Sequence, residues 1–593
     1  MTAPLDFKYE QVRGVNLEVG SDKMTELRTL DLEPASLRGA AVGDFNGDSK
    51  PDAAFARLRN GASKGEVFLA FGDGARGREL SLDALHPPEG AALVFSDGKS
   101  GTTLASGGDF NSDGKDDLIL RVSINKGGGN SVEEWLLVAG RDSFAEGTPI
   151  DALEKTTRIF SSSNEVQFTG ASAIVPDVNG DRIDDLLLSS ARQEGRTLLY
   201  IVTGSKAWPS EAIDLETLAE DGLGARLEVA LNVERIAGSL GDFNGDRAND
   251  VFFSGRGVRQ EGAMVIVYGG PAIFTGDTFP LTTGFFGDNG GLLVAGPSLY
   301  SGIASGAAGA GDIDGDGDQD VFFYIDSYGA CTLAPRAGGG AIFDYAAALS
   351  GGVPTGYGDH LRDLYASKPT GLPDFMPAGP GVQSGVFYLE GSVALEGLGS
   401  TAAPAGDFDG DGIADLLVGA PGVSSNDANA GACYILRGKR GLLLLDEDIA
   451  RFPGLGEQGL RFSATPAGSR LGKFVQGGFD WDKDGLGDVL VAGDDGRAFV
   501  VFGVGSESTF IRGDADADGQ PRLTDAVVTL LYLFQGGLAL PCLDAADSND
   551  DGIVNIADPI YTLSYLFLGG PAPPAPFPQP GSDLTGDALG CFR

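Results

Sequence analysis

Histidine, cysteine and long apolar runs are scarce in this sequence. Its 593 residues include 2 histidines and 4 cysteines, and the cysteines do not make a disulfide framework. The most apolar segments, near 526–540 and 559–568, are too short for a membrane helix and are broken by glycine or polar residues. The first residues lack the basic start and apolar run of a signal peptide. We therefore expect the chain to be either cytoplasmic or a mature form with a replaced start.

Basic residues are also scarce. Lysine and arginine number 42 against 84 acidic residues, which gives a formal charge of −42. Such a surface repels nucleic acid and anionic lipid, because both require clustered basic side chains. We expect cations to belong to the folded protein, since this much like charge would otherwise oppose compaction.

Glycine, in contrast, is abundant at 93 residues, and aspartate recurs in a repeat. The pattern Asp-x-[Asn/Asp]-x-Asp-x-x-x-Asp occurs seven times, with a spacing near 65 to 70 residues for most copies. Oxygen side chains at positions 1, 3, 5 and 9, with a backbone carbonyl at position 7, form a shortened version of the EF-hand ligand set. Glycine at position 4 or 6 permits the tight turn. The pattern predicts a calcium site. A turn without a metal ion needs only one or two such residues.

The candidate ligands of the seven loops, with position 7 contributing its carbonyl, are Asp44, Asn46, Asp48, Lys50, Asp52; Asp109, Asn111, Asp113, Lys115, Asp117; Asp177, Asn179, Asp181, Ile183, Asp185; Asp242, Asn244, Asp246, Ala248, Asp250; Asp312, Asp314, Asp316, Asp318, Asp320; Asp407, Asp409, Asp411, Ile413, Asp415; and Asp480, Asp482, Asp484, Leu486, Asp488. We expect about seven calcium ions here, each with a structural role.

Two apolar runs follow most of the loops, and the second run ends in glycine, as in Val67–Gly72 and Phe499–Gly503. Short strands at this period predict one four-stranded sheet per repeat, hence a mainly β fold with a seven-bladed β-propeller over residues 1–505. Few residues follow Gly503 before the next module, so the last blade lacks an outer strand. We expect the N-terminus, around Phe7–Val19, to supply that strand and to close the ring.

The segment Gly406–Pro421 contains the sixth loop and ends in the run Leu-Leu-Val-Gly-Ala-Pro. In this it resembles the FG-GAP repeat of integrin α-subunit propellers. The resemblance implies a calcium-loaded, seven-bladed propeller that binds a partner through its loops.

Residues 506–593 contain two longer loops, each followed by an apolar helical segment, at an offset of 33 residues. Their candidate ligands are Asp514, Asp516, Asp518 and Asp525, then Asp547, Asn549, Asp551, Asn555 and Asp558, for two further calcium ions. We expect the Pro-rich segment 571–580 to pack back or to extend as polyproline. Cys542 and Cys591 flank the module and could pair in an exported protein, whereas Cys331 and Cys433 are expected to be free and packed.

These paired loop–helix halves resemble a dockerin type I domain, a small α-helical calcium module related to the EF-hand. The resemblance implies a cohesin partner, but Arg522 replaces the usual Asn or Asp at position 9 of the first loop. The alternative is a calcium-stapled cap. Arg512-Gly513-Asp514 is an RGD tripeptide, yet Asp514 is already a candidate calcium ligand, which argues against adhesion through it.

No residue is assigned to catalysis. The sequence has no Gly-x-Ser-x-Gly elbow, zinc motif or phosphate loop. A long insertion at 340–385 with several aromatic residues could bind a ligand or could be decorative. We therefore expect an extracellular or cell-surface calcium protein that binds glycan or protein partners in adhesion or assembly, without nucleic acid or a membrane span. The alternative is a secreted polysaccharide-active enzyme, a glycosidase or lyase with a dockerin appendage.

Overall fold

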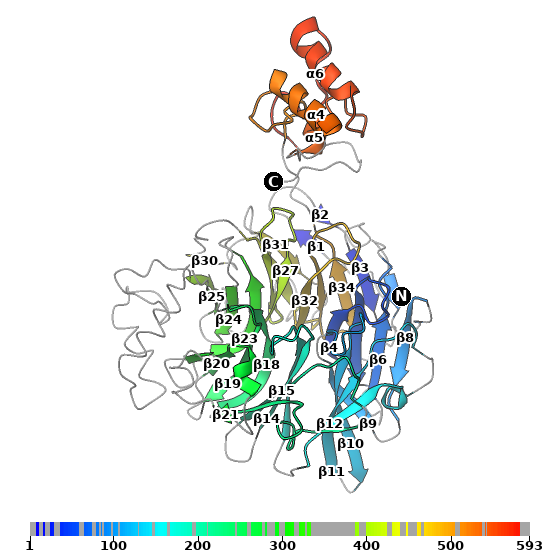
Figure 1. Ribbon diagram of the computed structural model, residues 1–593, viewed down its shortest axis with the longest axis vertical. Coiled ribbons are helices and arrows are strands. Elements are labelled where there is room, and N and C mark those ends of the chain that lie inside the picture. Colours follow the sequence, from blue (N-terminus) through cyan, green and yellow to red (C-terminus); the bar gives the residue numbers. More distant parts are fainter. Residues whose placement is uncertain are drawn as a thin grey trace, which may run out of the picture. The chain divides into compact units, whose positions relative to one another are not determined.

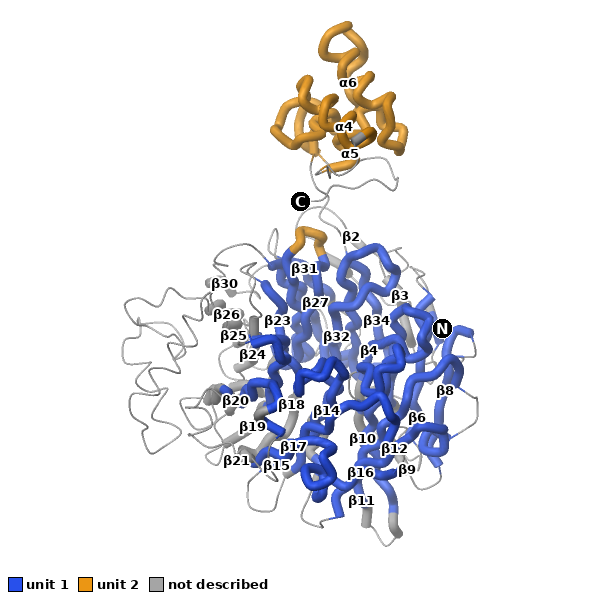
Figure 2. Tube along the Cα trace, viewed as in Figure 1, with its two compact units in different colours: residues 1–408, 413–503 blue, residues 409–412, 504–593 orange. Residues whose placement is uncertain are grey.

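The computed structural model divides the chain into two compact units. Unit 1 comprises residues 1–408 and 413–503, and unit 2 comprises residues 409–412 and 504–593 (Figure 2). The structure describes residues 36–503 with gaps, of which 334–385 is the longest, together with 8–10, 16–17, 24–28, 510–535, 540 and 542–581. The insertion at 340–385, which could bind a ligand or be decorative, therefore lies outside the described residues.

Unit 1 is mainly β and forms a β-propeller, as predicted (Figure 1). Its described strands make seven sheets. In sequence order, the first four are β4 (Ser36–Gly43), β5 (Asp52–Leu58), β6 (Gly65–Ala70) and β8 (Gly90–Val94); β9 (Lys99–Leu104), β10 (Leu118–Gly127), β11 (Asn130–Val138), β12 (Thr156–Phe160) and β16 (Ile213–Asp214); β13 (Gln167–Val175), β14 (Asp185–Ala191), β15 (Thr197–Val202), β17 (Gly224–Val229) and β21 (Phe279–Pro280); and β18 (Leu231–Gly241), β19 (Asp250–Gly257), β20 (Gly262–Val267) and β22 (Gly291–Ala295).

The other three are β23 (Ile303–Gly311), β24 (Asp320–Ile325), β25 (Gly329–Leu333), β26 (Val386–Glu390) and β30 (Asp446–Asp448); β27 (Thr401–Gly406), β28 (Asp415–Ala420), β29 (Ala432–Leu436), β31 (Gly459–Ser463), β1 (Lys8–Glu10) and β2 (Asn16–Leu17); and β32 (Phe474–Phe479), β33 (Asp488–Ala492), β34 (Arg497–Val501), β3 (Met24–Arg28) and β7 (Glu79–Ser81). Short 3₁₀ helices occur at Ile150–Ala152 and Pro271–Phe274.

The N-terminus does complete the seventh sheet, but with a different segment from the one predicted. Strand β3 pairs antiparallel with β34, Met24 opposite Val501. The predicted segment Phe7–Val19 instead contains β1 and β2, and β1 pairs with β31 at the outer edge of the sixth sheet. In the other sheets the outer strand ends only a few residues before the next first strand, as from β8 to β9. The closing strand therefore had to be sought just before β4.

Several sheets carry a fifth, parallel edge strand that the sequence analysis did not predict. Strands β16, β21, β30 and β7 pair in parallel with β12, β17, β26 and β3. Each comes from the connection between the third and fourth strands of the following sheet, and β7 returns from the first sheet to the seventh. These strands cover outer edges that would otherwise be free to pair with another chain.

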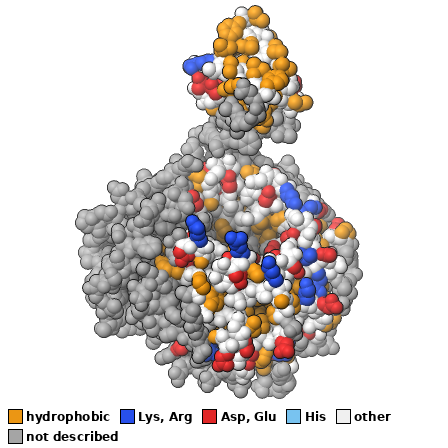
Figure 3. Space-filling model, viewed as in Figure 1, with side chains coloured by type: hydrophobic (Ala, Val, Ile, Leu, Met, Phe, Trp, Pro, Cys, Tyr) orange, Lys and Arg blue, Asp and Glu red, His pale blue; other side chains and the backbone are white. Residues whose placement is uncertain are grey.

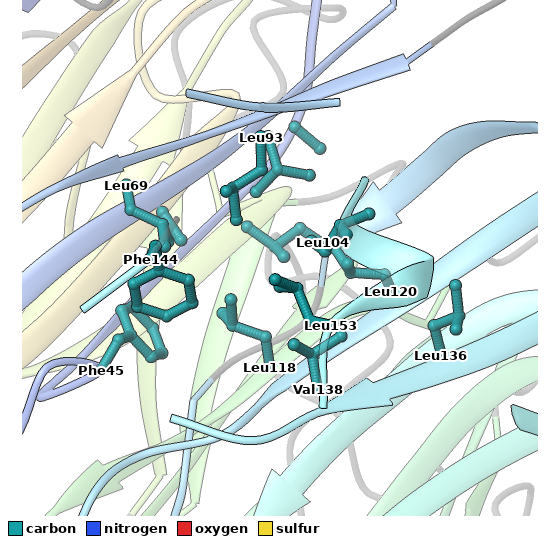
Figure 4. Close-up of a cluster of buried hydrophobic side chains, with 14 of the residues drawn as sticks. Phe45, Leu69, Leu93, Leu104, Leu118, Leu120, Leu136, Val138, Phe144 and Leu153 are labelled. Carbon is teal, nitrogen blue, oxygen red and sulfur yellow. The ribbon is translucent and has the colours of Figure 1, made fainter. Parts of the chain in front are cut away.

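The hydrophobic core lies between neighbouring sheets. Between the first and second sheets, Phe45, Leu69, Leu93, Leu118 and Leu120 belong to one cluster of buried side chains (Figure 4). The seventh sheet packs on the first in the same way, through a cluster that includes Phe55, Phe68, Leu490 and Val500. Most first strands also contact the first strand of a neighbouring sheet: β4 with β9, β13 with β18, β18 with β23, β23 with β27, β27 with β32, and β32 with β4.

Unit 2 contains α4 (Leu523–Gln535), α5 (Leu543–Ala546) and α6 (Ala557–Leu568), and α4 contacts α6. The two apolar segments after the loops are therefore helical, as predicted. Helix α6 ends at Gly569, whose left-handed backbone (φ 69°) suits glycine. The Pro-rich segment packs back on the unit: the ring of Phe577 lies 5.4 Å from that of Tyr565. Among the residues that the structure describes, no helix is long and apolar enough to cross a bilayer.

Candidate metal centres

The aspartate loops of unit 1 connect the first and second strands of their sheets. The loop that begins at Asp44 leaves β4 and enters β5 at Asp52. Asp109, Asp177, Asp242, Asp312, Asp407 and Asp480 begin the corresponding loops. The strands that were predicted to follow each loop are present, since β5, β10, β14, β19, β24, β28 and β33 begin at or next to position 9.

Position 1 organises the turn. The Asp44 carboxylate accepts hydrogen bonds from the backbone N–H groups of Gly47 at 2.7 Å, Asp48 at 3.1 Å and Ser49 at 2.7 Å. These bonds require left-handed backbone at positions 4 and 6, with φ 77° at Gly47 and 65° at Ser49. The requirement recurs in Gly180 and Arg182, Gly410 and Gly412, and Lys483 and Gly485. The left-handed backbone explains why glycine was predicted at these positions. Most of the loops seen in full nevertheless carry one non-glycine residue at position 4 or 6.

Position 9 is the most buried carboxylate in the six loops whose position-9 side chain the structure describes. Asp52 is fully buried. Its Oδ2 accepts the N–H of Phe45 at 3.0 Å, and its Oδ1 accepts the N–H of Gly72 at 2.9 Å. Five other loops repeat both bonds: Asp117 with Phe110 and Gly140, Asp185 with Val178 and Gly204, Asp250 with Phe243 and Gly269, Asp415 with Phe408 and Gly438, and Asp488 with Trp481 and Gly503.

Burial makes these carboxylates costly to ionise. Desolvation raises the pKa of Asp52 and Asp117 to about 8, and that of Asp185 and Asp488 to about 7. The aspartates at positions 1 and 5 add to the shift by charge repulsion in the first two of these loops. A bound cation would remove both penalties, because it attracts the ionised form. The loops therefore have the electrostatic character of cation sites.

Carboxylate oxygens converge in two propeller loops. One oxygen from each of Asp407, Asp409 and Asp415 lies within 4.8 Å of the others, and Asp480, Asp482 and Asp488 do the same. Calcium takes six to eight oxygen ligands in flexible geometry, so a purely oxygen set with backbone carbonyls nearby fits it. In the first four loops asparagine stands at position 3. There Asn46 Oδ1 accepts the N–H of Asp48 at 2.8 Å.

Positions 5 and 7 also bond to each other. The N–H of Lys50 donates to Asp48 Oδ1 at 2.9 Å, and the N–H of Ala248 donates to Asp246 Oδ1 at 2.9 Å. In the second loop, Lys155 Nζ lies 3.5 Å from Asp113 Oδ2, so an internal cation already contacts one candidate ligand. Of the predicted ligands, Asn244, Asp314, Asp316 and Asp318 lie outside the described residues.

Two features of these loops were missed by the sequence analysis. Position 2 is always apolar and buried in the core: Phe45, Phe110, Val178, Phe243, Ile313, Phe408 and Trp481. The glycine that ends the second run is fixed by close contact, since a Cβ on Gly140 would lie 2.4 Å from the carbonyl oxygen of Asp116. The recurrence of an apolar residue at position 2 was a visible signal. The glycine contact was not visible, because it depends on how the second and third strands fold back onto the loop.

The C-terminal loops have the same local organisation. Asp514 accepts the N–H groups of Asp518 at 3.1 Å and Gly519 at 2.9 Å. Oxygens of Asp514, Asp516 and Asp525 lie within 4.8 Å of one another. Burial raises the pKa of Asp525 to about 6. Arg522, the residue that departs from the pattern at position 9, places NH1 2.8 Å from Asp518 Oδ2. This loop thus carries its own competing cation.

The second C-terminal loop keeps an amide at position 9. Asp547 accepts the N–H groups of Asp551 at 3.2 Å and Gly552 at 2.7 Å. Asp558 accepts the N–H of Asn555 at 2.7 Å, and burial is the main cause that raises its pKa to about 7. No arginine is paired with a ligand carboxylate of this loop among the described residues. The second loop is thus the more open of the two to a cation.

The RGD tripeptide is structural. Arg512 is fully buried and its guanidinium donates to the carbonyl oxygens of Asp544, Asp547 and Ala575 at 3.0–3.2 Å. Its NH2 lies 2.9 Å from Asp550 Oδ1. The side chain therefore joins both loop regions to the Pro-rich segment and is not presented to a partner, in agreement with the expectation from the sequence.

The cysteines differ in state. Cys542 is disulfide-bonded, and Cys591, its expected partner, lies outside the described residues. Cys433 is a free thiol, as predicted, and burial raises its pKa far above the usual range.

Comparison with known proteins identifies one repeat directly. Residues 398–436 match the FG-GAP repeat family, and this segment contains the loop whose sequence carried the resemblance. Integrin alpha-4 of Xenopus laevis is 34% identical over 167 residues, which cover 26% of this chain and 14% of the integrin. Integrin alpha-X of Mus musculus is 36% identical over 106 residues, which cover 17% of this chain and 8% of the integrin. The chain spans only a small part of these relatives. It contains an FG-GAP repeat within a β-propeller and is similar over these stretches to integrin α-subunits.

Proposed function

We propose that this protein is an extracellular calcium-binding propeller that recognises a protein or glycan partner in adhesion or assembly. The similarity to integrin α-subunits supports a binding role. The observation that carries the calcium part is the set of buried position-9 aspartates, such as Asp52 and Asp117, whose ionisation the fold itself disfavours. A disulfide-bonded Cys542 favours an oxidising compartment, and weak calcium sites fill at the millimolar calcium found outside cells.

We also propose that the seven sheets are seven blades of one ring, locked by β3. The cluster that joins Phe55 and Phe68 of the first sheet to Leu490 and Val500 of the seventh supports this arrangement. An experimental structure with a further sheet between these two would contradict it.

The binding role can be tested on the full chain with a glycan array and a panel of extracellular-matrix proteins. Each panel is run with millimolar calcium and again with a chelator. We expect saturable binding that the chelator abolishes. Binding that is equal in both conditions would separate partner recognition from calcium, and no binding in either panel would contradict the proposed role.

A second role, docking to a protein partner, is supported by the apolar surface of unit 2. On α4, Leu523, Val527 and Phe534 are 52%, 44% and 68% exposed. At the equivalent positions 33 residues later, Ile556 just before α6 and Ile560 and Phe567 on α6 are 52%, 55% and 65% exposed. Figure 3 shows hydrophobic side chains spread over the visible face of this unit. Exposed apolar side chains gathered in this way mark interaction sites.

We propose that this face makes unit 2 a dockerin-like module with two calcium ions and a cohesin-like partner. Binding of the full chain to a panel of cohesin modules tests the idea. The double variant Val527→Asp with Ile560→Asp should abolish binding, whereas Gln579→Asp, an exposed polar position in the same unit, should not. Binding that survives the double variant would place the partner site elsewhere, and no binding by the wild type would contradict a cohesin-like partner.

A further inference from the structure

The metal loops of neighbouring sheets are hydrogen-bonded to each other. The backbone N–H at position 8 donates to the position-1 carbonyl oxygen of the preceding loop, as from Asp116 to Asp44 at 2.9 Å. Asn249, Ala414 and Gly487 make the same bond to Asp177, Asp312 and Asp407 at 2.8–3.3 Å. Adjacent candidate metal centres are therefore connected through the backbone of their own ligands.

At the first two junctions a carboxylate at position 8 also joins the loops. Asp116 Oδ2 accepts the N–H of Asp44 at 2.7 Å. One sheet further on, Asp184 Oδ2 accepts the N–H of Asp109 at 2.9 Å. Both carboxylates stand at position 8, next to the position-9 ligand of their own loop. Each one thus contacts a candidate ligand of one loop and adjoins a candidate ligand of the next.

The preceding residue leaves room for this carboxylate. A Cβ on Gly43 would lie only 2.7 Å from Asp116 Oδ2. A Cβ on Gly108 would lie 3.0 Å from Asp184 Oδ2 and 2.5 Å from Ile174 Cγ2. Glycine before position 1 is therefore part of the junction, because any side chain there would displace the bridging carboxylate.

The junction between the seventh and first loops lacks the connection. Position 8 of the first loop is Pro51, which has no N–H to donate. A cavity of about 380 Å³ lies at this junction, lined by residues that include Lys50, Pro51, Gln476 and Phe479. The first loop is thus hydrogen-bonded to the second loop, whereas the corresponding backbone bond to the seventh loop is missing.

We infer that Asp116 and Asp184 are bridging residues that couple divalent-cation binding in the first three loops, whereas the first and seventh loops bind independently. The inference rests on the proposed calcium function. A cation in the first loop holds Asp44 in place and thereby orders Asp116 and the adjacent ligand Asp117. The Asp116 carboxylate would also attract a cation in either of the two loops that it joins. By linkage, a cation in the second loop favours the first to the same extent.

Hydrogen exchange measured by mass spectrometry during a calcium titration tests the coupling on the full chain. For each loop, we determine separately the calcium concentration at which its backbone amides reach half of their full protection from exchange. Asp48→Asn weakens the first loop while keeping a side-chain acceptor for the N–H of Lys50. We expect this change to raise the midpoint of the second loop about tenfold, within the usual range of coupling energies, and to leave the seventh loop unchanged. An unmoved second loop, or an equal shift in the seventh, would overturn the inference.

Two variants then assign the coupling to the bridge. In Asp116→Asn or Gly43→Ala backgrounds, Asp48→Asn should no longer move the second loop. Gly43→Ala changes no charge, so it separates the position of the carboxylate from its charge. Glu220→Gln, an exposed acid for which no partner is described, is the matched control and should leave the coupling intact. If a variant does not fold, the comparison between the wild type and the single variant Asp48→Asn decides whether the first and second loops are coupled. If calcium protects no loop, the proposed function fails first.

Discussion

Removal of calcium should make the stability of unit 1 fall as pH rises. The pKa of Asp52 and Asp117 is raised from 3.8 to about 8, and that of Asp185 and Asp488 to about 7. In this window the unfolded chain has released these protons and the folded, metal-free chain still holds them. A raised carboxylate pKa therefore stabilises the fold below about pH 4, and that contribution is lost as pH rises towards 7 or 8.

The size of the effect follows from linkage. Each group lowers the free energy of unfolding by about 1.4 kcal/mol per pH unit in this window, so four groups lower it by about 6 kcal/mol per unit. Two pH units would then remove about 11 kcal/mol, which is comparable to the whole stability of a typical domain. Calcium binds the ionised form and should abolish the dependence, because it releases the same protons that burial retained.

Thermal unfolding followed by circular dichroism measures this directly. In chelator, we expect the melting temperature to fall steeply between about pH 5 and pH 8. In millimolar calcium it should stay nearly constant and should be higher throughout. The control is magnesium at the same concentration, which prefers fewer protein ligands and should restore less. A melting temperature that is flat or rises with pH in chelator would refute the electrostatic argument.

Three further predictions concern single positions. Arg522→Asn should tighten calcium binding in the first C-terminal loop by roughly tenfold, because it frees Asp518 from an internal cation; an unchanged calcium isotherm for that loop would count against this. Gly140→Ala should destabilise unit 1 by about 1–3 kcal/mol in urea unfolding, since its Cβ would meet a backbone carbonyl at 2.4 Å; Gly309→Ala, whose nearest atom is at 3.3 Å, should cost less. Arg512→Met should cost unit 2 about 3–5 kcal/mol and leave the melting of unit 1 unchanged, whereas a partner-facing arginine would cost almost nothing.

Much of the candidate site could be predicted from the sequence, because the loops are local structures. Ligand spacing, turn geometry and the following strand all lie within about ten residues of Asp44 or Asp177. The helices after the C-terminal loops were predictable for the same reason, since capping glycine and apolar runs act over a few residues. The competing cation Arg522 was visible as a departure at one position, although its contact with Asp518 was not.

The closing strand was harder to place. Strand β3 pairs with β34 across more than 450 residues of sequence, and its own residues, MTELR, carry little strand signal. The edge strands β7 and β16 are similarly short and pair with the neighbouring sheet. Such pairings depend on which edge is free in the assembled ring, a property that no local pattern records.

The sequence by itself determined that the chain repeats an aspartate loop and that a strand follows each loop, since these features follow from residue types at fixed short spacings. Only the tertiary structure decided how the loops meet. Asp116 reaches Asp44, and Pro51 leaves the last junction unbonded, because packing of whole sheets brings residues together that are distant in the chain. Contacts between repeats, unlike those within one, are set by the ring as a whole.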